Sequence, residues 1–342
     1  MAPNFADIYE SIVLHPTSDD NDPLLIFLIT GNPGLVSYYN TYLHHLQALC
    51  NGQLLSSNSS RRIGVHIYSC SLAGFETSPC TGVANSQRNI YDLDQQIEYI
   101  DDALEHAGED VSQRTGTKTP RVVLIGHSVG AYMLMEILRR RKAARATQMI
   151  KIVGGVCLTP TIVNLRGSPS GRKVSYIGSQ TYFASAAASL ANALLWPFPD
   201  ALLLRTIKAI TGMPDEAAAT TFRFLRSPNG IHQALHMLRF ELAQMTIDKW
   251  DDEIWGVSES LSNPRDKTKL FFYFADHDHW VANDTRDQLI AARASSAKMG
   301  EEDRPEMEVD RTGLPHAFCI RDEPVAEKTV GYIQKIVQLN WQ

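Results

Sequence analysis

The sequence predicts an α/β fold, in which a mostly parallel central sheet is flanked by helices. Apolar runs of strand length alternate with stretches of helical periodicity along most of the chain. One of these runs leads through a glycine-containing turn directly into a helix-forming segment, and a long helical stretch interrupts the alternation before the last strands. Strands that alternate with helices in this way are typical of parallel sheets with right-handed crossover connections.

The first strand of this sheet is expected at 24–29, a continuous apolar run between Pro23 and Gly31. Six apolar residues in a row predict a strand that is buried on both faces. The other elements are expected from apolar runs for strands and from apolar residues at helical spacing for helices. In chain order they are a helix at 38–49, a strand at 64–69, a helix at 87–106, a strand at 122–125, a helix at 131–138, strands at 152–158, 270–275 and 306–309, and a helix at 327–339, with a polar loop at 298–305.

The segment at 126–130 has the pattern Gly-x-Ser-x-Gly, with Ser128 at its centre and Gly126 and Gly130 at its ends. Between a strand and a helix, this pattern is typical of the nucleophile elbow of α/β-hydrolases. The serine occupies a sharp, strained turn, so the residues two before and two after it must be nearly free of side chain. The helix that follows directs its first N–H groups and the positive end of its dipole toward the reaction centre. Ser128 is therefore the candidate nucleophile of an α/β-hydrolase fold.

A helical cap is expected between the strands at 152–158 and 270–275. The sequence there is rich in Ala and Leu and reads as helical from about 164 to 246. A helical insertion between two late strands is where this fold class keeps its lid. We therefore expect an α/β-hydrolase core at 1–163 and 251–342, with a helical cap or lid at 164–250.

Composition and charge favour a globular, intracellular protein. The chain has 342 residues, of which 44% are hydrophobic and 20% charged, enough to bury a large core. A net charge of −6 without a basic stripe makes nucleic acid an unexpected partner. The cysteines are odd in number and form no C-x-x-C pair, which favours a reducing compartment. They are Cys50, Cys70, Cys80, Cys157 and Cys319.

No cleaved signal peptide is expected, because the residues at 1–7 lack a basic and an apolar region. The uncharged stretch at 174–199 comes nearest to a membrane segment, but polar side chains, Pro197 and Pro199 interrupt it. We expect peripheral contact with a lipid droplet or endoplasmic reticulum surface in preference to a spanning segment. Between peripheral contact and helices packed over an acyl pocket, the packed helices are the preferred reading of this stretch, with the protein then in the cytoplasm.

A carboxylate that orients the catalytic histidine is expected just after the strand at 270–275, because α/β-hydrolases have the chain order Ser, Asp or Glu, His. Asp278 fits best, since its surroundings read Ala-x-x-Asp-x-x-Val, similar to the turn that is common after that strand. Asp276 and Asp284 are the competing candidates. His277 and His279 flank Asp278 and can be read as metal ligands, but neighbours in an extended turn point apart, so polar loop residues are the preferred reading. No metal and no cofactor is expected.

His316 is the candidate general base. A hydroxyl is a poor nucleophile at neutral pH, and a hydrogen-bonded imidazole that removes its proton makes it a good one. His316 follows Gly313 and Pro315 in a segment after the strand at 306–309, as expected for a loop that presents an imidazole. His127 is read as a packing residue, because the elbow turns the side chains of consecutive residues apart.

An oxyanion hole requires backbone donors beside the nucleophile, and the loss of one donor costs on the order of 3 kcal/mol. One donor is expected to be the N–H of Val129, the residue after the serine. The second is expected from the loop that follows the strand at 24–29, where Gly31 and Gly34 give the backbone freedom and Asn32 is the candidate. A plain Asn-Pro-Gly turn is the alternative reading of that loop.

These residues together resemble the lipid droplet-associated hydrolase family. The resemblance spans nearly the whole chain, and its specific part is the Gly-Asn-Pro-Gly loop combined with the elbow. It is carried by the segments at 29–34, 38–39, 72–75, 93–97, 126–132, 160–162, 168–171 and 278–281 and by His316, whereas 163–166 is divergent. The resemblance implies an α/β-hydrolase with a Ser128, Asp278 and His316 triad, association with lipid droplets or endoplasmic reticulum, and hydrolysis of an ester or lipid.

The leading hypothesis is a serine hydrolase that cleaves a carboxylic ester or thioester of a hydrophobic, lipid-like substrate through an acyl-enzyme. The apolar cap favours an acyl or polyketide-like group over a sugar or peptide. Two alternatives stay open. One is a lipid-droplet surface protein with weak or vestigial activity. The other is an acyltransferase or a biosynthetic-pathway hydrolase that acts on a dedicated small molecule.

Overall fold

The computed structural model describes residues 4–17, 22–54, 63–77, 89–144, 149–178, 180, 182–252, 254–255, 268–294, 304–321 and 324–341. Cys80 and most of the loop expected at 298–305 lie outside these residues. The strands are β1 (Ser11–Leu14), β2 (Asp22–Ile29), β3 (Ile63–Cys70), β4 (Arg121–His127), β5 (Lys151–Leu158), β6 (Lys269–Phe274) and β7 (Glu306–Val309). The α-helices outside the β5–β6 connection are α1 (Phe5–Ile8), α2 (Asn40–Gln53), α3 (Leu93–Thr115), α4 (Val129–Ala144), α10 (Asn283–Ala294) and α11 (Val325–Asn340).

The strands form one sheet in the order β1-β3-β2-β4-β5-β6-β7. Every neighbouring pair is parallel except β1 and β3. This arrangement confirms the predicted α/β fold with a mostly parallel sheet. The edge strand β1 was not predicted, because four half-buried residues form neither an apolar run nor a clear alternation.

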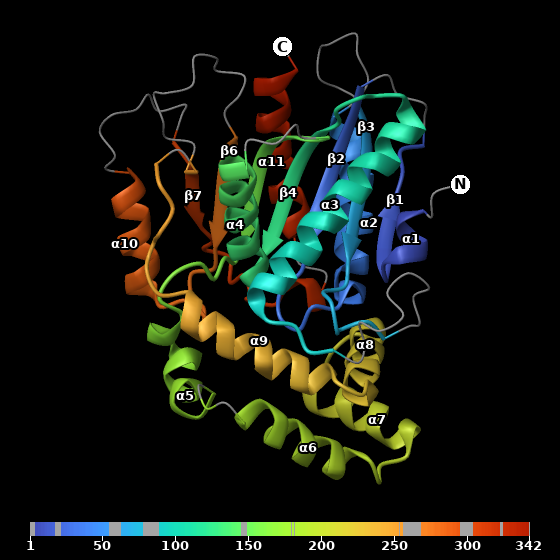
Figure 1. Cartoon of the computed structure of the whole chain (residues 1–342), viewed down its shortest axis with the longest axis vertical. Helices are drawn as coiled ribbons and strands as arrows, with labels where there is room; N and C mark the ends of the chain where they lie inside the picture. The colour runs from blue at the N-terminus through green and yellow to red at the C-terminus, as the bar shows by residue number, and fades with distance from the viewer. Residues whose placement is uncertain are drawn as a thin grey trace.

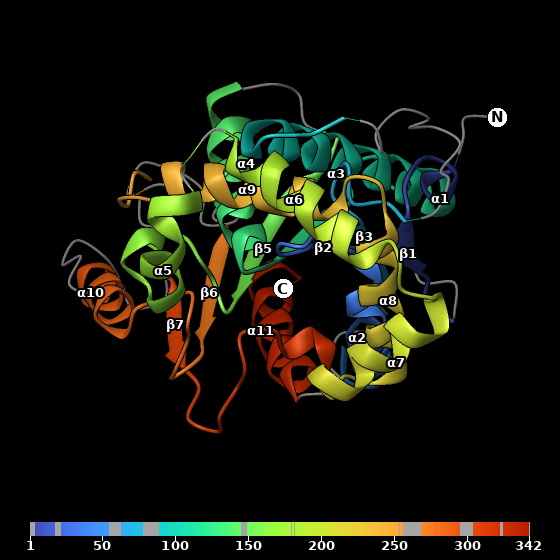
Figure 2. The same cartoon turned by 90° about the horizontal axis from the view of Figure 1, so that it is seen from below.

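The two faces of the sheet are covered by different helices (Figures 1 and 2), which explains why residues 24–29 of β2 are all apolar. Alternate side chains of a strand point to opposite faces. Leu24, Ile26 and Leu28 belong to the core layer under α2 and α11. Leu25, Phe27 and Ile29 belong to the layer under α3 and α4. All six are fully buried, as predicted for 24–29.

Helix α3 begins later and ends later than predicted. It was expected at 87–106, but the described residues 89–92 precede the helix, which runs from Leu93 to Thr115. Asp92 caps its N-terminus by accepting a hydrogen bond from Gln95 N, and Gln95 reaches back to the Asp92 backbone. Gly116 ends the helix in the left-handed conformation, with φ of 74°. The capping box, not the apolar spacing, therefore defines where the helix starts.

Among the described residues between β5 and β6, five α-helices occur, and we call them the inserted helices. They are α5 (Pro169–Gly178), α6 (Phe183–Leu195), α7 (Asp200–Thr211), α8 (Asp215–Arg226) and α9 (Gly230–Gln244). Figure 1 shows them together below the end of the sheet at which β4 terminates, with α9 nearest to the strands and α6 and α7 farther out. They lie next to the carboxyl ends of the parallel strands, where sheets of this class bind their ligands.

Candidate active site

Ser128 occupies the turn between β4 and α4, with a φ of 55°. This left-handed conformation is uncommon for a residue with a side chain and persists only where the surroundings enforce it. The Ser128 N–H donates to the Leu158 carbonyl at 3.1 Å, and its own carbonyl accepts from Ala131 N at 3.0 Å and Thr161 N at 3.2 Å. Hydrogen bonds from the end of β5 therefore stabilise the strained turn, which places the serine hydroxyl group at the carboxyl ends of the parallel strands.

The glycines on either side of Ser128 are required by close backbone contacts. A Cβ at Gly126 would lie 2.5 Å from the Gly130 carbonyl oxygen, and a Cβ at Gly130 would lie 2.4 Å from the carbonyl oxygen of Ile29. Backbone atoms cannot give way as a flexible side chain can. The spacing of the motif thus lets α4 start directly against the end of β2.

The loop after β2 approaches the elbow equally closely. A Cβ at Gly31 would lie 3.2 Å from the Ser128 Cβ, and a Cβ at Gly34 would lie 2.5 Å from the side chain of Leu72. The loop that contains Asn32 therefore lies directly beside the nucleophile candidate through Gly31, whereas Gly34 makes room for Leu72.

Ser128, His316 and Asp278 lie along one hydrogen-bonded line. The distance from Ser128 Oγ to His316 Nε2 is 2.9 Å, and from His316 Nδ1 to Asp278 Oδ2 it is 2.7 Å. Asp278 lies in the loop after β6 and His316 in the loop after β7, so three different strand ends contribute to the line. A hydroxyl bonded to an imidazole, which is bonded in turn to a carboxylate, is the arrangement used for nucleophilic acyl transfer.

The Asp278 carboxylate is held in its charged form. Burial raises the pKa of Asp278, but the hydrogen bond and charge of His316 and the hydrogen bond from Trp280 N outweigh burial, so the pKa lies below its ordinary value. Trp280 N donates to Asp278 Oδ1 at 2.7 Å. Each carboxylate oxygen thus has a donor, which fixes the plane of the group relative to the imidazole.

The competing carboxylates lie elsewhere. Asp276 keeps 48% of its side chain exposed and lies 3.9 Å from the Arg286 guanidinium. Asp284 lies in the first turn of α10, where a carboxylate favours the helix N-terminus. The hydrogen bond to His316 Nδ1 comes from Asp278.

His127 joins the elbow to both neighbouring loops, a role that its reading as a packing residue did not include. Its Nε2 lies 2.8 Å from the His316 carbonyl oxygen, and its Nδ1 lies 2.6 Å from the Tyr39 hydroxyl. The carbonyl can only accept, so Nε2 carries the proton and Nδ1 accepts from Tyr39. The Tyr39 oxygen accepts in turn from Gly31 N at 2.8 Å. Burial and the nearby His316 lower the pKa of His127 to about 3, so the ring stays neutral.

The candidate oxyanion donors lie on the two segments that meet at Ser128. Val129 is the first residue of α4, where a backbone N–H has no acceptor within the helix. Asn32 belongs to the loop that approaches Ser128 through Gly31. Their role as donors stays a prediction.

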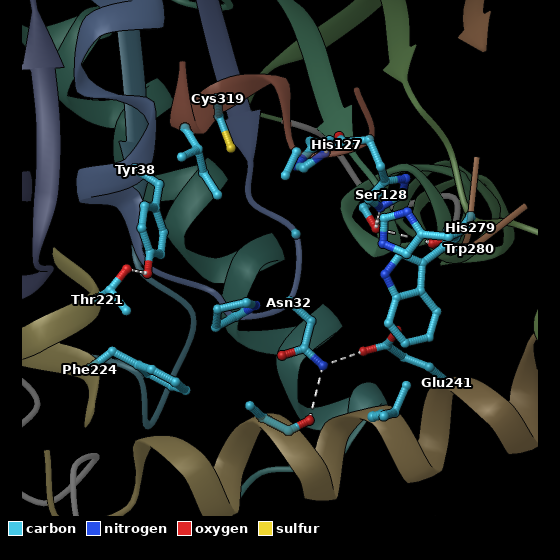
Figure 3. Close-up of a pocket in the computed structure, with 18 of the residues that line it drawn as sticks. Asn32, Tyr38, His127, Ser128, Thr221, Phe224, Glu241, His279, Trp280 and Cys319 are labelled. Atoms are coloured by element: carbon cyan, nitrogen blue, oxygen red, sulfur yellow. Dashed lines mark hydrogen bonds between the residues drawn. The ribbon is translucent and has the colours of Figure 1, made fainter. Parts of the chain in front are cut away.

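A cavity of about 420 Å³ opens beside Ser128 and His316 (Figure 3). Its walls come from the loop after β2, from the loops that carry His279 and His316, and from α8 and α9 of the inserted helices. Most of the lining is apolar, including Tyr38, Leu165, Met213, Phe224, Leu225, Leu235, Leu238, Trp280 and Ile320. Such a volume and lining are typical of a site for a small hydrophobic ligand.

The two histidines beside Asp278 diverge, as expected. His277 leaves 86% of its side chain exposed, whereas His279 lines the cavity. Over the part of the chain that the structure describes, no three His, Cys, Asp or Glu side chains form a group that could hold a metal ion.

Three polar residues of the site were not singled out from the sequence. The Tyr39 hydroxyl group lies 2.6 Å from His127 Nδ1, and Thr159 Oγ1 donates to the His316 carbonyl at 3.0 Å. Glu241 lines the cavity and is 5% exposed. The one available signal for Glu241 is an acidic residue close to the apolar residues Leu238, Phe240 and Leu242.

Comparison with known proteins extends over nearly the whole chain. The model of the family described as lipid-droplet associated hydrolase matches residues 22–319, a span that includes Ser128, Asp278 and His316. Lipid droplet-associated hydrolases from Gallus gallus and Homo sapiens are each 26% identical to the chain, over 301 and 321 residues. These alignments cover 87% and 90% of this chain and 80% and 83% of the relatives.

Solved structures agree with the fold. Juvenile hormone epoxide hydrolase from the silkworm Bombyx mori is similar with a TM-score of 0.52, covering 96% of this chain and 73% of that one. The sequences are 12% identical, so the likeness shows the fold alone. Together with the sheet order, it confirms the predicted α/β-hydrolase fold.

Proposed function

Because the chain belongs to the lipid-droplet associated hydrolase family, we propose that it is a serine esterase that cleaves a hydrophobic carboxylic ester or thioester at Ser128. Family and fold make the chain a hydrolase; the nucleophile, the bond and the substrate are what the proposal adds. The observation that supports it most strongly is the hydrogen-bonded line from Ser128 through His316 to Asp278 beside an apolar cavity.

In the first step, Ser128 Oγ attacks the carbonyl carbon of the substrate while His316 Nε2 takes the hydroxyl proton. Asp278 keeps the imidazole in the tautomer with its proton on Nδ1 and stabilises the imidazolium that forms. The tetrahedral intermediate then collapses. The bond to the leaving alcohol or thiol breaks, His316 returns the proton to that group, and Ser128 carries the acyl chain.

In the second step, water replaces the alcohol. His316 Nε2 takes a proton from the attacking water, a second tetrahedral intermediate forms and collapses, and the proton returns to Ser128 Oγ as the carboxylic acid leaves. The backbone N–H groups of Val129 and Asn32 are the proposed donors to the oxyanion in both steps. An alcohol in place of water would make the same machinery an acyltransferase.

The inserted helices form the proposed lid. α8 and α9 contribute the apolar side chains that face the reacting groups, so a long acyl or polyketide-like chain can be buried there. The proposed division of the chain is the one expected from the sequence, with a hydrolase core at 1–163 and 251–342 and a lid at 164–250.

The outer side of the lid is the proposed contact with lipid. Leu190, Leu194 and Trp196 on or next to α6 are 64%, 62% and 84% exposed, and Ile210 on α7 is 79% exposed. Ala184 and Ala188 on the other side of α6 are buried, and α6 packs against α9. Large apolar side chains on an outer surface mark a contact with another apolar phase.

The membrane contact that we propose is peripheral. Among the helices that the structure describes, no single one is both long and apolar enough to cross a bilayer, and only α6 and α7 taken together reach that composition, with a bend of 112° between them. The relatives' names place them with lipid droplets, and a droplet or endoplasmic reticulum surface is the location that we propose for this chain.

Labelling with a fluorophosphonate tests the enzyme against the alternative of a vestigial surface protein. We expect stoichiometric labelling of the wild-type chain and none of Ser128→Ala. Ser175→Ala, which alters another half-buried serine, is the matched control and should label as the wild type does. A wild-type chain that stays unlabelled would leave only the surface-protein reading.

A further inference from the structure

The cavity contains a polar pair that the proposed reaction does not use: the side chains of Asn32 and Glu241. Asn32 Nδ2 donates to the Ala234 carbonyl at 3.0 Å and to Glu241 Oε1 at 2.8 Å. Both acceptors lie on α9, so the amide of the loop after β2 is tied to the lid. In Figure 3 these two bonds run from Asn32 down to α9 and across to Glu241.

The two bonds fix which way the amide faces. The Ala234 carbonyl can only accept, so the nitrogen of Asn32 and not its oxygen lies toward α9. Both N–H bonds of the amide are then used. The oxygen has to point elsewhere, and Figure 3 shows it turned away from Glu241, toward the side of the cavity where Phe224 lies.

The Asn32 oxygen is an unsatisfied acceptor. Oδ1 is buried from solvent and has no hydrogen-bond partner among the residues that the structure describes. A buried acceptor without a donor costs the free energy of its desolvation, and native structures retain such groups mainly where a ligand or ordered water completes them. A ligand in the apolar cavity that brings its own donor can complete this acceptor once the side chains that cover Oδ1 give way slightly.

The Tyr38 hydroxyl group, a candidate donor in the cavity wall, is already engaged. The hydroxyl oxygens of Tyr38 and Thr221 are 2.7 Å apart. Thr221 directs its single hydroxyl proton to the Ala217 carbonyl at 2.9 Å, so Tyr38 donates to Thr221. The Tyr38 proton is therefore committed within the wall and is not available to the Asn32 oxygen.

The chemistry around the pair favours an uncharged donor. Burial raises the pKa of Glu241 to about 7, against the opposing effect of the Asn32 hydrogen bond. A carboxyl group with a pKa near 7 is only partly ionised at neutral pH, so it is a weaker counter-charge to an ammonium group than an ordinary carboxylate. A hydroxyl group fits both the free acceptor and the apolar lining, because it adds one donor to an otherwise hydrophobic molecule.

We propose that Asn32 Oδ1 accepts a hydrogen bond from a hydroxyl group of the substrate, with Glu241 as the positioning residue that orients the amide. The substrate class that follows is a hydrophobic ester whose cavity-bound part carries a hydroxyl group. The proposal rests on the proposed function only in placing the ester bond at Ser128; recognition of the hydroxyl group is a binding property of the cavity.

The test measures binding in the Ser128→Ala chain, so that no turnover is needed. The probes are methyl decanoate and its monohydroxylated isomers, with the hydroxyl group moved along the chain one carbon at a time, and the readout is Kd by calorimetry. At least one isomer should bind tenfold or more tightly than methyl decanoate, because a site built around a hydrogen bond rejects a ligand that lacks the donor. Isomers that all bind within threefold of methyl decanoate would overturn the proposal.

Three variants in the same Ser128→Ala background locate the effect. Glu241→Gln keeps an acceptor for Asn32 Nδ2 and should retain the preference, whereas Glu241→Leu should reduce it to about threefold or less. Leu238→Met changes another wall residue without adding a polar atom and should leave the ratio of the two Kd values unchanged. If Glu241→Leu keeps the tenfold preference for the hydroxylated isomer, Glu241 does not position the Asn32 amide. Failure of the proposed function would appear separately, as ester turnover that survives Ser128→Ala.

Discussion

The imidazole Nε2 of His127 lies 2.8 Å from the backbone carbonyl oxygen of His316. The residue before the candidate nucleophile therefore holds the backbone of the candidate base. The same ring accepts from Tyr39, which accepts from Gly31 beside the candidate oxyanion loop. One neutral side chain thus joins the three segments that have to keep their relative positions during the proposed reaction.

His127→Phe should lower kcat/KM for short esters by about 10- to 100-fold, because a displacement of the base by a fraction of an ångström weakens its hydrogen bond to Ser128. The phenyl ring keeps the aromatic contact with Phe318, whose ring centroid is 4.9 Å from that of His127. The melting temperature should therefore change little while kcat/KM falls. Steady-state kinetics with thermal unfolding in parallel measure both. His277→Gln, at the exposed histidine, is the control. Wild-type kcat/KM in His127→Phe would show that the network has no positioning role.

Asp278→Asn should lower kcat by about 10⁴-fold with the fold intact, because an amide in that place favours the wrong imidazole tautomer. Asp276→Asn is the matched substitution two residues earlier, at a side chain that is half exposed, and should stay within about twofold of the wild type. Equal losses in the two variants would mean that Asp278 has no special relation to His316.

Glu241→Gln should change how stability depends on pH. The pKa of Glu241 is raised to about 7 by burial, above the ordinary value of 4.5. A raised pKa in the folded state means that the contribution of the group to stability is fully present below pH 4.5 and is lost as the pH rises through about 7. The wild-type chain should therefore lose up to about 3 kcal/mol between pH 4.5 and pH 8 from this group, and Glu241→Gln should not.

Urea unfolding at about pH 5 and about pH 8 measures this difference. Glu98→Gln, which removes a carboxylate with 73% of its side chain exposed, is the control and should behave as the wild-type chain does. If Glu241→Gln loses the same stability between the two pH values as the wild-type chain, Glu241 is not a buried titrating group.

Replacing Leu194 and Trp196 together by Ser should reduce the fraction of protein bound to triolein droplets by tenfold or more. Their exposed fractions of 62% and 84% leave most of each side chain free to enter an apolar phase. A tenfold loss corresponds to about 1.4 kcal/mol, within what two large apolar side chains contribute. Flotation of droplets measures binding. Ile247→Ser, at a residue 71% exposed after α9, is the control, and equal binding of the double variant and the wild-type chain would place the contact elsewhere.

The sequence was sufficient for features that depend on neighbouring residues. The elbow could be recognised because its glycines and serine form a local pattern, although the contact that requires Gly130 comes from Ile29 on β2. The strand at 24–29 could be recognised because burial on both faces leaves an uninterrupted apolar run. The side chains of Ser128, Asp278 and His316 lie within hydrogen-bonding distance, as their order along the chain suggested, while their chemical roles stay predictions.

Hydrogen bonds between distant residues that belong to no sequence motif could not be predicted. The bond between Tyr39 and His127 joins positions 88 residues apart, and the bond between Asn32 and Glu241 joins positions 209 apart. Nothing local distinguishes such a tyrosine from a surface residue, and the apolar neighbours of Glu241 are the one local sign of its burial. The start of α3 was misplaced for a different reason: Ile90 continues the apolar spacing of the helix, although the chain becomes helical only after the Asp92 cap.

The most direct test of the account is capture of the acyl-enzyme. The chain is mixed with p-nitrophenyl decanoate, quenched with acid during the first turnovers, digested, and analysed by mass spectrometry. The account predicts a decanoyl group on the peptide that contains Ser128, and neither adduct nor turnover in Ser128→Ala. A decanoyl group on another residue, or undiminished turnover in Ser128→Ala, would contradict it.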